Sequence, residues 1–171
     1  LRWKKINDRI RMAGVIQKIF YVASWACVRV FALLMLRLDI RRQSSLPKSP
    51  VIFVANHPSA TDPFIIHMIS RKRQLNVLIT AKAFNVPVFG WFLRQVEEIP
   101  VPLQEGSLAL EQARQHLDRG RSVVIFIEGH ISPQEGGFLP PRSGAARLAL
   151  SSGMPVVPVG ISLRRERCLN I

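Results

Sequence analysis

Five short apolar runs alternate with helical patterns along residues 50–162, and this alternation constrains the fold more than any other feature. The runs are rich in β-branched residues and apolar throughout, which is typical of strands buried on both faces of a sheet. Strands that alternate with helices predict an α/β fold: a single domain with a mostly parallel central sheet flanked by helices. The predicted strands are 51–55, 76–80, 98–101, 122–127 and 156–161. The predicted helices are roughly 62–71, 87–95, 107–118 and 143–152.

The ends of two helices are marked by their own residues. Ser107 is expected to cap the helix at 107–118, and Gly120 to terminate it. Ser143 and Gly153 stand at the two ends of the last helix. These signals mark the boundaries between the helices and the loops. In a parallel sheet, a ligand site is expected in the loops that follow the strands.

A basic arm, residues 1–48, precedes the domain at 49–171. The arm holds 11 Lys/Arg against two acids, so it carries +9 of the net charge of +13. Residues 19–36, IFYVASWACVRVFALLML, contain Arg29 as their only charge, and a helix of this length spans roughly 27 Å. Basic residues flank both ends, whereas a spanning helix has its basic excess on one side. We therefore expect a helix, or a hairpin broken near Ala23–Ser24, lying in the cytoplasmic leaflet; a buried core helix is the alternative.

The expected partner of this arm is a membrane bilayer. Basic residues suit nucleic acid equally well, but nucleic-acid binding needs base-stacking aromatics or a groove-reading element among them, and we identify no such recognition element in the arm. Cys27 and Cys168 form no CxxC pattern, so we expect no metal site, no disulfide framework and a reducing cytosolic setting. The chain begins at Leu1 without a methionine, and we expect a fragment whose domain is incomplete at its C-terminus.

The turn after the first strand, VANHPSATDPF at 54–64, places an imidazole and a carboxylate five residues apart. Pro63 suits the first turn of the next helix, so Thr61 or Asp62 caps it. If Thr61 is the cap, Asp62 is free to accept the Nδ1–H of His57, which leaves Nε2 as a base. On spacing alone, a helix start beside an ordinary loop histidine fits equally well. His67 and His116, the latter on a polar face, are expected to be structural.

The usual motifs for nucleophilic catalysis are missing from the sequence. It contains no GxSxG elbow, no P-loop and no glycine fingerprint after a strand. If the turn is catalytic, its base must activate a hydroxyl that the substrate supplies. The transfer then proceeds without a covalent intermediate on the protein.

The segment NHPSATD resembles the N-H-x-x-x-x-D signature of the glycerolipid and lysophospholipid acyltransferases. Three further blocks follow in the family's order, and the resemblance covers roughly residues 50–162. They are FGWFLRQVEEIPV, SVVIFIEGHIS and RSGAARLALSSGMPVVPVGI. Four blocks in the right order are far more specific than one.

The resemblance implies a membrane-associated O-acyltransferase. It moves a fatty acyl group from acyl-CoA or acyl-carrier protein, as co-substrate and without a cofactor, to the hydroxyl of a glycerolipid or lysophospholipid. His57 deprotonates the acceptor and Asp62 supports His57. The residues assigned to substrate binding are Asn56, Glu128, Gly129 and Arg142. A non-catalytic member that binds lipid or a partner is the alternative.

This sequence also departs from the family pattern where the acceptor phosphate is gripped. Glu97 stands where glycine is usual, Leu103 where an arginine is expected, and His130–Ile131 replaces Thr–Arg. Bidentate arginine is hard to replace at a phosphate site. We therefore expect an acceptor other than lysophosphatidic acid: a lysophospholipid with a substituted headgroup, or a neutral or amino-acid lipid.

Overall fold

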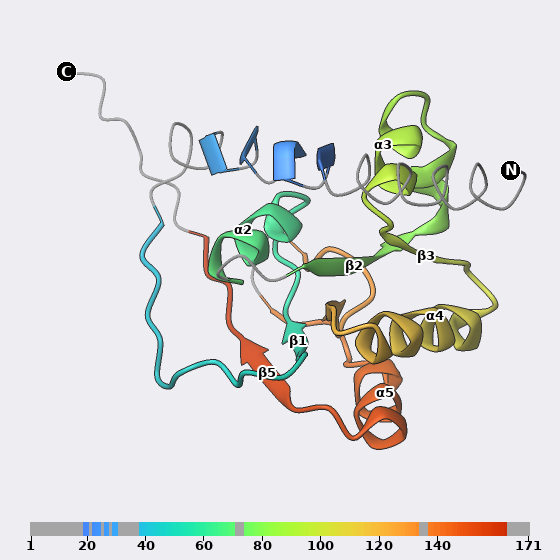
Figure 1. Ribbon diagram of the computed structural model, residues 1–171. Helices are drawn as coiled ribbons and strands as arrows, with labels where there is room; N and C mark the ends of the chain where they lie inside the picture. Colours follow the sequence, from blue (N-terminus) through green and yellow to red (C-terminus); the bar gives the residue numbers. More distant parts are fainter. Residues whose placement is uncertain are drawn as a thin grey trace, which may run out of the picture.

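The computed structural model describes residues 19–20, 22–24, 26–27, 29–30, 38–70, 74–133 and 137–163. Its elements follow one another as strand and helix (Figure 1). The strands are β1 (Ile52–Ala55), β2 (Leu75–Thr80), β3 (Ile99–Val101), β4 (Ser122–Phe126) and β5 (Val156–Val159). The helices are α2 (Asp62–Ile69), the 3₁₀ helix η1 (Ala81–Asn85), α3 (Phe89–Gln95), α4 (Gly106–Asp118) and α5 (Gly144–Ser152).

The five strands form one sheet in the order β3-β2-β4-β1-β5, and every pairing is parallel. This confirms the α/β prediction, and the sheet is wholly parallel rather than mostly so. β1 lies between β4 and β5, with Ile52 opposite Val123 on one side and Val156 on the other. The carboxyl ends of β1 and β4 are therefore neighbours, which brings the loops after them together.

Side chains alternate between the two faces of the sheet, as the two-residue period of a strand requires. One face of the sheet packs against α4 and α5, and the other against α2. In β4, for example, Val123 and Ile125 point toward α4 and α5, whereas Val124 and Phe126 point toward the α2 face. Burial on both faces explains why the strands read as continuous apolar runs rather than alternating ones.

The helix ends agree with the sequence signals in part. Ser143 and Gly153 are the N-cap and C-cap of α5, and Gly153 has φ 67°. Gly120, with φ 81°, follows the last turn of α4 as predicted. The predicted cap at Ser107 is wrong: α4 begins at Gly106 and Glu105 is its N-cap, so Ser107 lies inside the first turn. The backbone turns into the helix too early for the hydroxyl to cap it.

The described residues of the arm between 19 and 30 are helical, and Ile19, Val22 and Val30 are exposed. Those residues do not fit the alternative of a buried core helix. No helix within the described part of the chain combines the length and hydropathy needed to cross a membrane. The rest of the predicted segment 19–36, including the predicted end at residues 31–36, lies outside the described residues.

Candidate active site

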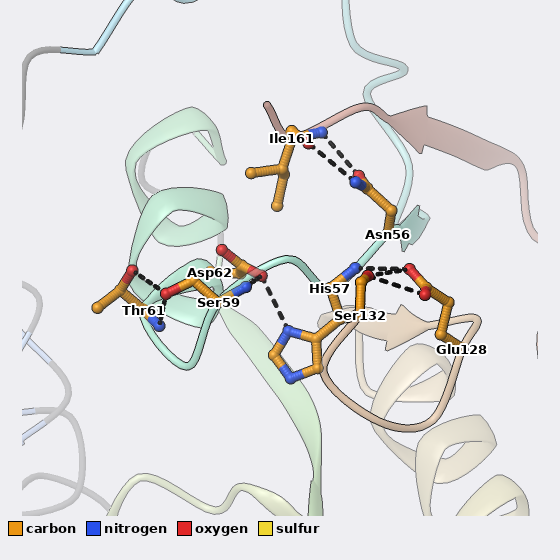
Figure 2. A network of polar contacts seen from close by, with 8 residues as sticks. All are labelled: Asn56, His57, Ser59, Thr61, Asp62, Glu128, Ser132 and Ile161. Carbon is orange, nitrogen blue, oxygen red and sulfur yellow. Dashed lines mark hydrogen bonds and ion pairs between the residues drawn. The ribbon is translucent and has the colours of Figure 1, made fainter. Parts of the chain in front are cut away.

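His57 and Asp62 meet in the turn between β1 and α2. His57 Nδ1 lies 2.9 Å from Asp62 Oδ2, and the Asp62 side chain is fully buried while that of His57 is 17% exposed. Thr61 is the N-cap of α2 and makes no side-chain cap hydrogen bond, so the carboxylate of Asp62 is available to the imidazole as predicted. Figure 2 shows the second ring nitrogen on the side of the ring turned away from Asp62.

The turn itself orients the carboxylate. The backbone N–H of Ser59 donates to Asp62 Oδ2 at 2.7 Å, so the oxygen that faces the imidazole has a second donor. The Ser59 and Thr61 hydroxyls lie 3.0 Å apart, and the Thr61 N–H donates to Ser59 Oγ. A carboxylate can only accept, so the shared proton belongs to His57 Nδ1 and the lone pair of the ring to Nε2.

A ring from the neighbouring strand supports the imidazole. Phe126, the last residue of β4, stacks on His57 with ring centroids 4.1 Å apart and planes 19° from parallel. This contact comes from the α2 face of the sheet, where Phe126 belongs to the core. The imidazole is therefore held by Asp62 along one edge and by Phe126 on one face.

Glu128 holds the backbone of His57 in place. It is 2% exposed, and its carboxylate accepts hydrogen bonds from the His57 N–H at 3.1 Å, the Leu139 N–H at 2.8 Å and the Ser132 hydroxyl. The Ser132 N–H in turn donates to the His57 carbonyl at 2.8 Å. Figure 2 shows this cluster on the side of His57 away from Asp62.

The same contacts keep Glu128 ionised. Burial acts to raise the pKa of Glu128, but the hydrogen bonds from Leu139, His57 and Ser132 outweigh burial and place the pKa below its ordinary value. A charged carboxylate with donors from three segments is a positioning group in this geometry. Its predicted part in substrate binding stays a prediction.

Asn56 closes the other side of the turn. Its amide Nδ2 donates to the Ile161 carbonyl at 2.8 Å, and its Oδ1 accepts from the Ile161 N–H at 2.7 Å. This two-way contact ties the loop after β1 to the segment after β5. Both ends of the Asn56 amide are thus engaged with the fold, so its predicted role toward substrate is likewise untested.

Gly129 and Arg142 lie against each other at the exposed rim. Gly129 has φ 69°, and a Cβ at that position would lie 2.7 Å from Arg142 Nε, so glycine is required twice over. Arg142 Nη2 lies 3.2 Å from His130 Nε2 and donates to it. His130 thus stands beside the guanidinium at one of the positions where the sequence departs from the family pattern.

The structure also describes residues 97, 103 and 131, three positions at which this sequence differs from the family pattern. Glu97 has φ 58°, the left-handed region that favours glycine, which explains why glycine is usual at this position in the family pattern. Its carboxylate pairs with Arg121. Leu103 and Ile131 are exposed apolar side chains where the family pattern has arginines.

His67 and His116 lie in α2 and α4, and the expectation that they are structural stays a prediction. His67 and His116 have pKa values lowered by burial, with the Arg119 charge adding to the effect at His116. His116 is buried, so its predicted place on a polar face is wrong. Sequence reasoning missed Phe126, Ser132 and Leu139. Ser132 had a signal, since it lies four residues after Glu128 in the quoted third block.

Comparisons with known proteins identify the family of the chain. A model of the acyltransferase family matches residues 37–162. The chain belongs to the acyltransferase family. Within that family, the lyso-ornithine lipid O-acyltransferase of Pseudomonas aeruginosa is 30% identical over 169 residues, 96% of this chain and 62% of the relative. The 1-acyl-sn-glycerol-3-phosphate acyltransferase of the same organism is 29% identical over 157 residues, 88% of this chain and 58% of the relative.

A solved acyltransferase has a similar fold. The crystal structure of the 1-acyl-sn-glycerophosphate (LPA) acyltransferase PlsC from Thermotoga maritima has a TM-score of 0.65 and is 22% identical. The match covers 88% of this chain and 59% of that one. The chain therefore spans about three fifths of the length of each of these acyltransferases.

Proposed function

We propose that this protein transfers a fatty acyl group from acyl-CoA or acyl-carrier protein to the hydroxyl of a membrane lipid acceptor. The observation that carries the proposal is the 2.9 Å contact between His57 Nδ1 and Asp62 Oδ2, which leaves Nε2 as a base, in a chain of the acyltransferase family. The exposed apolar residues of the arm helix and its basic flanks support a location at a membrane. We place the protein monotopically on the cytoplasmic face.

In the proposed reaction, His57 Nε2 takes the proton of the acceptor hydroxyl as the oxygen attacks the thioester carbonyl carbon. Asp62 stabilises the imidazolium that forms. The tetrahedral intermediate then expels the thiolate, and the proton on Nε2 goes to the leaving sulfur. A positioned base of this kind contributes roughly 10²–10⁴ in rate.

For the acceptor, we propose a lysolipid without an exposed phosphate monoester, such as an amino-acid lipid. Leu103 and Ile131 are apolar and exposed where the family pattern places phosphate-gripping arginines. The relative named for lyso-ornithine lipid is aligned over nearly the whole of this chain. Arg142, beside His130, is the cation proposed to bind the anionic group of the donor or acceptor.

The test is an acceptor panel with radiolabelled acyl-CoA, run with the full-length protein. Lyso-ornithine lipid, lysophosphatidic acid and lysophosphatidylglycerol are compared in the same vesicles. We expect turnover that His57→Ala abolishes and that His116→Gln, a histidine change far from the turn, preserves. Undiminished turnover by His57→Ala contradicts the mechanism, and the absence of all turnover and hydrolysis supports a non-catalytic lipid binder. Lysophosphatidic acid as the best acceptor contradicts the acceptor assignment alone.

A further inference from the structure

Residues 86–91, here called the apolar tip, run from the end of η1 into the first turn of α3 and present four large apolar side chains to solvent. Val86, Val88, Phe89 and Trp91 are all exposed, Val88 to 80% and Trp91 to 51%. Single exposed apolar residues are ordinary, but a contiguous group marks a surface that meets another apolar phase. Neither the proposed chemistry nor the core uses these side chains.

Close packing and backbone hydrogen bonds join the apolar tip to η1, and they leave its large side chains on the outer side. A Cβ on Gly90 would lie 2.0 Å from the Phe84 carbonyl oxygen, which means that α3 packs directly on the backbone of η1. The Arg94 guanidinium donates to the same Phe84 carbonyl at 2.8 Å, and the Gly90 N–H donates to the Val86 carbonyl at 2.7 Å. The backbone of η1 fills the space on the inner side of the apolar tip. The large apolar side chains therefore lie on the opposite side, toward solvent.

Val88 occupies a strained turn at the most exposed point. Its φ and ψ are 62° and −55°, and the Phe89 N–H donates across it to the Pro87 carbonyl at 2.6 Å. This is the rare γ-turn with positive φ, a conformation that a β-branched residue adopts only against strain. Because the Val88 side chain is so exposed, it makes few packing contacts within the described fold that could offset this strain. Strain of this kind gathers at sites that serve a ligand or partner.

The charges around the apolar tip indicate an anionic partner. Between residues 75 and 98 the cations are Lys82 and Arg94. The two acids, Glu97 and Glu98, follow the C-terminal end of α3, where Glu97 pairs with Arg121 and Glu98 accepts from the Val77 N–H. Trp91 makes an edge-to-face contact with Phe20 of the arm, with ring centroids 5.5 Å apart. The arm carries the +9 balance described above, and in the view of Figure 1 its described helix begins near α3 and runs away from it, past α2. Tryptophan with flanking cations is the composition of a membrane–water interface.

We propose that the apolar tip inserts among the headgroups of an anionic bilayer as a second contact beside the arm, with the Trp91–Phe20 contact joining the two. The inference rests on the proposed function, since both the acceptor and the acyl chain come from lipid. The apolar tip would add a membrane contact on the domain itself. Two contacts, one on the arm and one on α3, set the orientation of the domain on the membrane.

The first test measures binding of the full-length protein to phosphatidylcholine vesicles with and without phosphatidylglycerol, by co-sedimentation. Val88→Glu is expected to lower the partition coefficient roughly tenfold or more, because an apolar contact becomes a buried charge facing anionic lipid. Val88→Gly, which fits the turn without strain, is expected to lower it several-fold while the fold is kept. Leu150→Glu, an equal change at an 87% exposed leucine on α5, is the matched control and should bind as the wild type does. Equal binding by all three variants overturns the proposal.

The second test follows Trp91 itself. With every tryptophan of the full-length protein other than Trp91 replaced by phenylalanine, Trp3 and Trp25 included, vesicles of brominated phosphatidylcholine mixed with phosphatidylglycerol are expected to quench the fluorescence of Trp91. If the apolar tip instead meets a second copy of the chain, quenching is absent and sedimentation shows a dimer that Val88→Glu dissociates, which overturns the proposal. Adding His57→Ala should leave quenching unchanged. Failure of the acyl-transfer chemistry and failure of the membrane contact are therefore distinguishable.

Discussion

In the proposed mechanism, the carboxylate of Asp62 both accepts hydrogen bonds that orient His57 and supplies a negative charge. Asp62→Asn tests the charge, because the side chain keeps its shape and loses its charge. Asp62 is fully buried, and its Oδ2 accepts from both His57 Nδ1 and the Ser59 N–H. Its Oδ1 is buried and has no hydrogen-bond partner among the described residues. Asparagine can enter this site in two orientations, and each of them is faulty.

In the first orientation, the amide oxygen takes the place of Oδ2 and keeps both hydrogen bonds. The NH₂ group then occupies the unpartnered Oδ1 position, where its buried donors cost about 1–3 kcal/mol of stability. In the second, the NH₂ group faces His57 and the Ser59 N–H, so one donor meets another and the imidazole must accept at Nδ1. The proton then sits on Nε2, which can no longer act as a base.

We expect Asp62→Asn to lower kcat by roughly 10²–10⁴ with KM little changed, because imidazolium stabilisation is lost in both orientations and Nε2 carries the proton in the second. Initial rates with radiolabelled acyl-CoA measure this, and denaturant unfolding measures the loss of about 1–3 kcal/mol. Asp118→Asn, which removes an exposed carboxylate near Arg114 on α4, is the matched control and should retain full activity. Activity of folded Asp62→Asn near that of the wild type refutes this account of the pair.

Burial raises the pKa of Glu98 from its ordinary value of 4.5 to about 8. Between these two pH values the folded protein keeps a proton on Glu98 that the unfolded chain has released. Stability should therefore fall as pH rises between these values, by at most about 1.4 kcal/mol per pH unit, and urea unfolding of Glu98→Gln should show a flatter profile. Gly90→Ala drives a Cβ into the Phe84 carbonyl and should cost about 2–3 kcal/mol, whereas Gly106→Ala meets open space and should be neutral or stabilising by thermal melting. Val88→Gly relieves a strain of about 1–3 kcal/mol against a backbone entropy cost of about 0.5–1 kcal/mol, so unfolding free energy should rise by about 1 kcal/mol even as vesicle binding falls.

The sheet was predictable because burial on both faces leaves a plain signal. The observed strands match the predicted ones to within one or two residues; β4, for example, ends at Phe126 rather than at residue 127. The pairing of His57 with Asp62 was predictable too, since it is local and depends on Thr61 taking the cap. Such features follow from residues close together in the chain.

The rest of the site depends on contacts between distant segments. The Asn56 clamp joins residues 105 positions apart, and the Glu128 contact to the His57 N–H spans 71. Neither follows from local pattern, because each depends on which strands become neighbours in the sheet. The γ-turn at Val88 could not be predicted from the sequence either, because valine rarely adopts a positive φ.

The hydrogen bonds that fix His57 have a consequence for how the protein acquires activity. The turn that holds His57 and Asp62 leaves β1, but the N–H and the carbonyl of His57 are both anchored by the loop that leaves β4. A chain in which β1 has formed and β4 has not yet joined it holds every residue of the N-H-x-x-x-x-D segment without a fixed base. Recovery of turnover during refolding should therefore report the docking of these two strands, and lag behind any signal that senses helix formation alone.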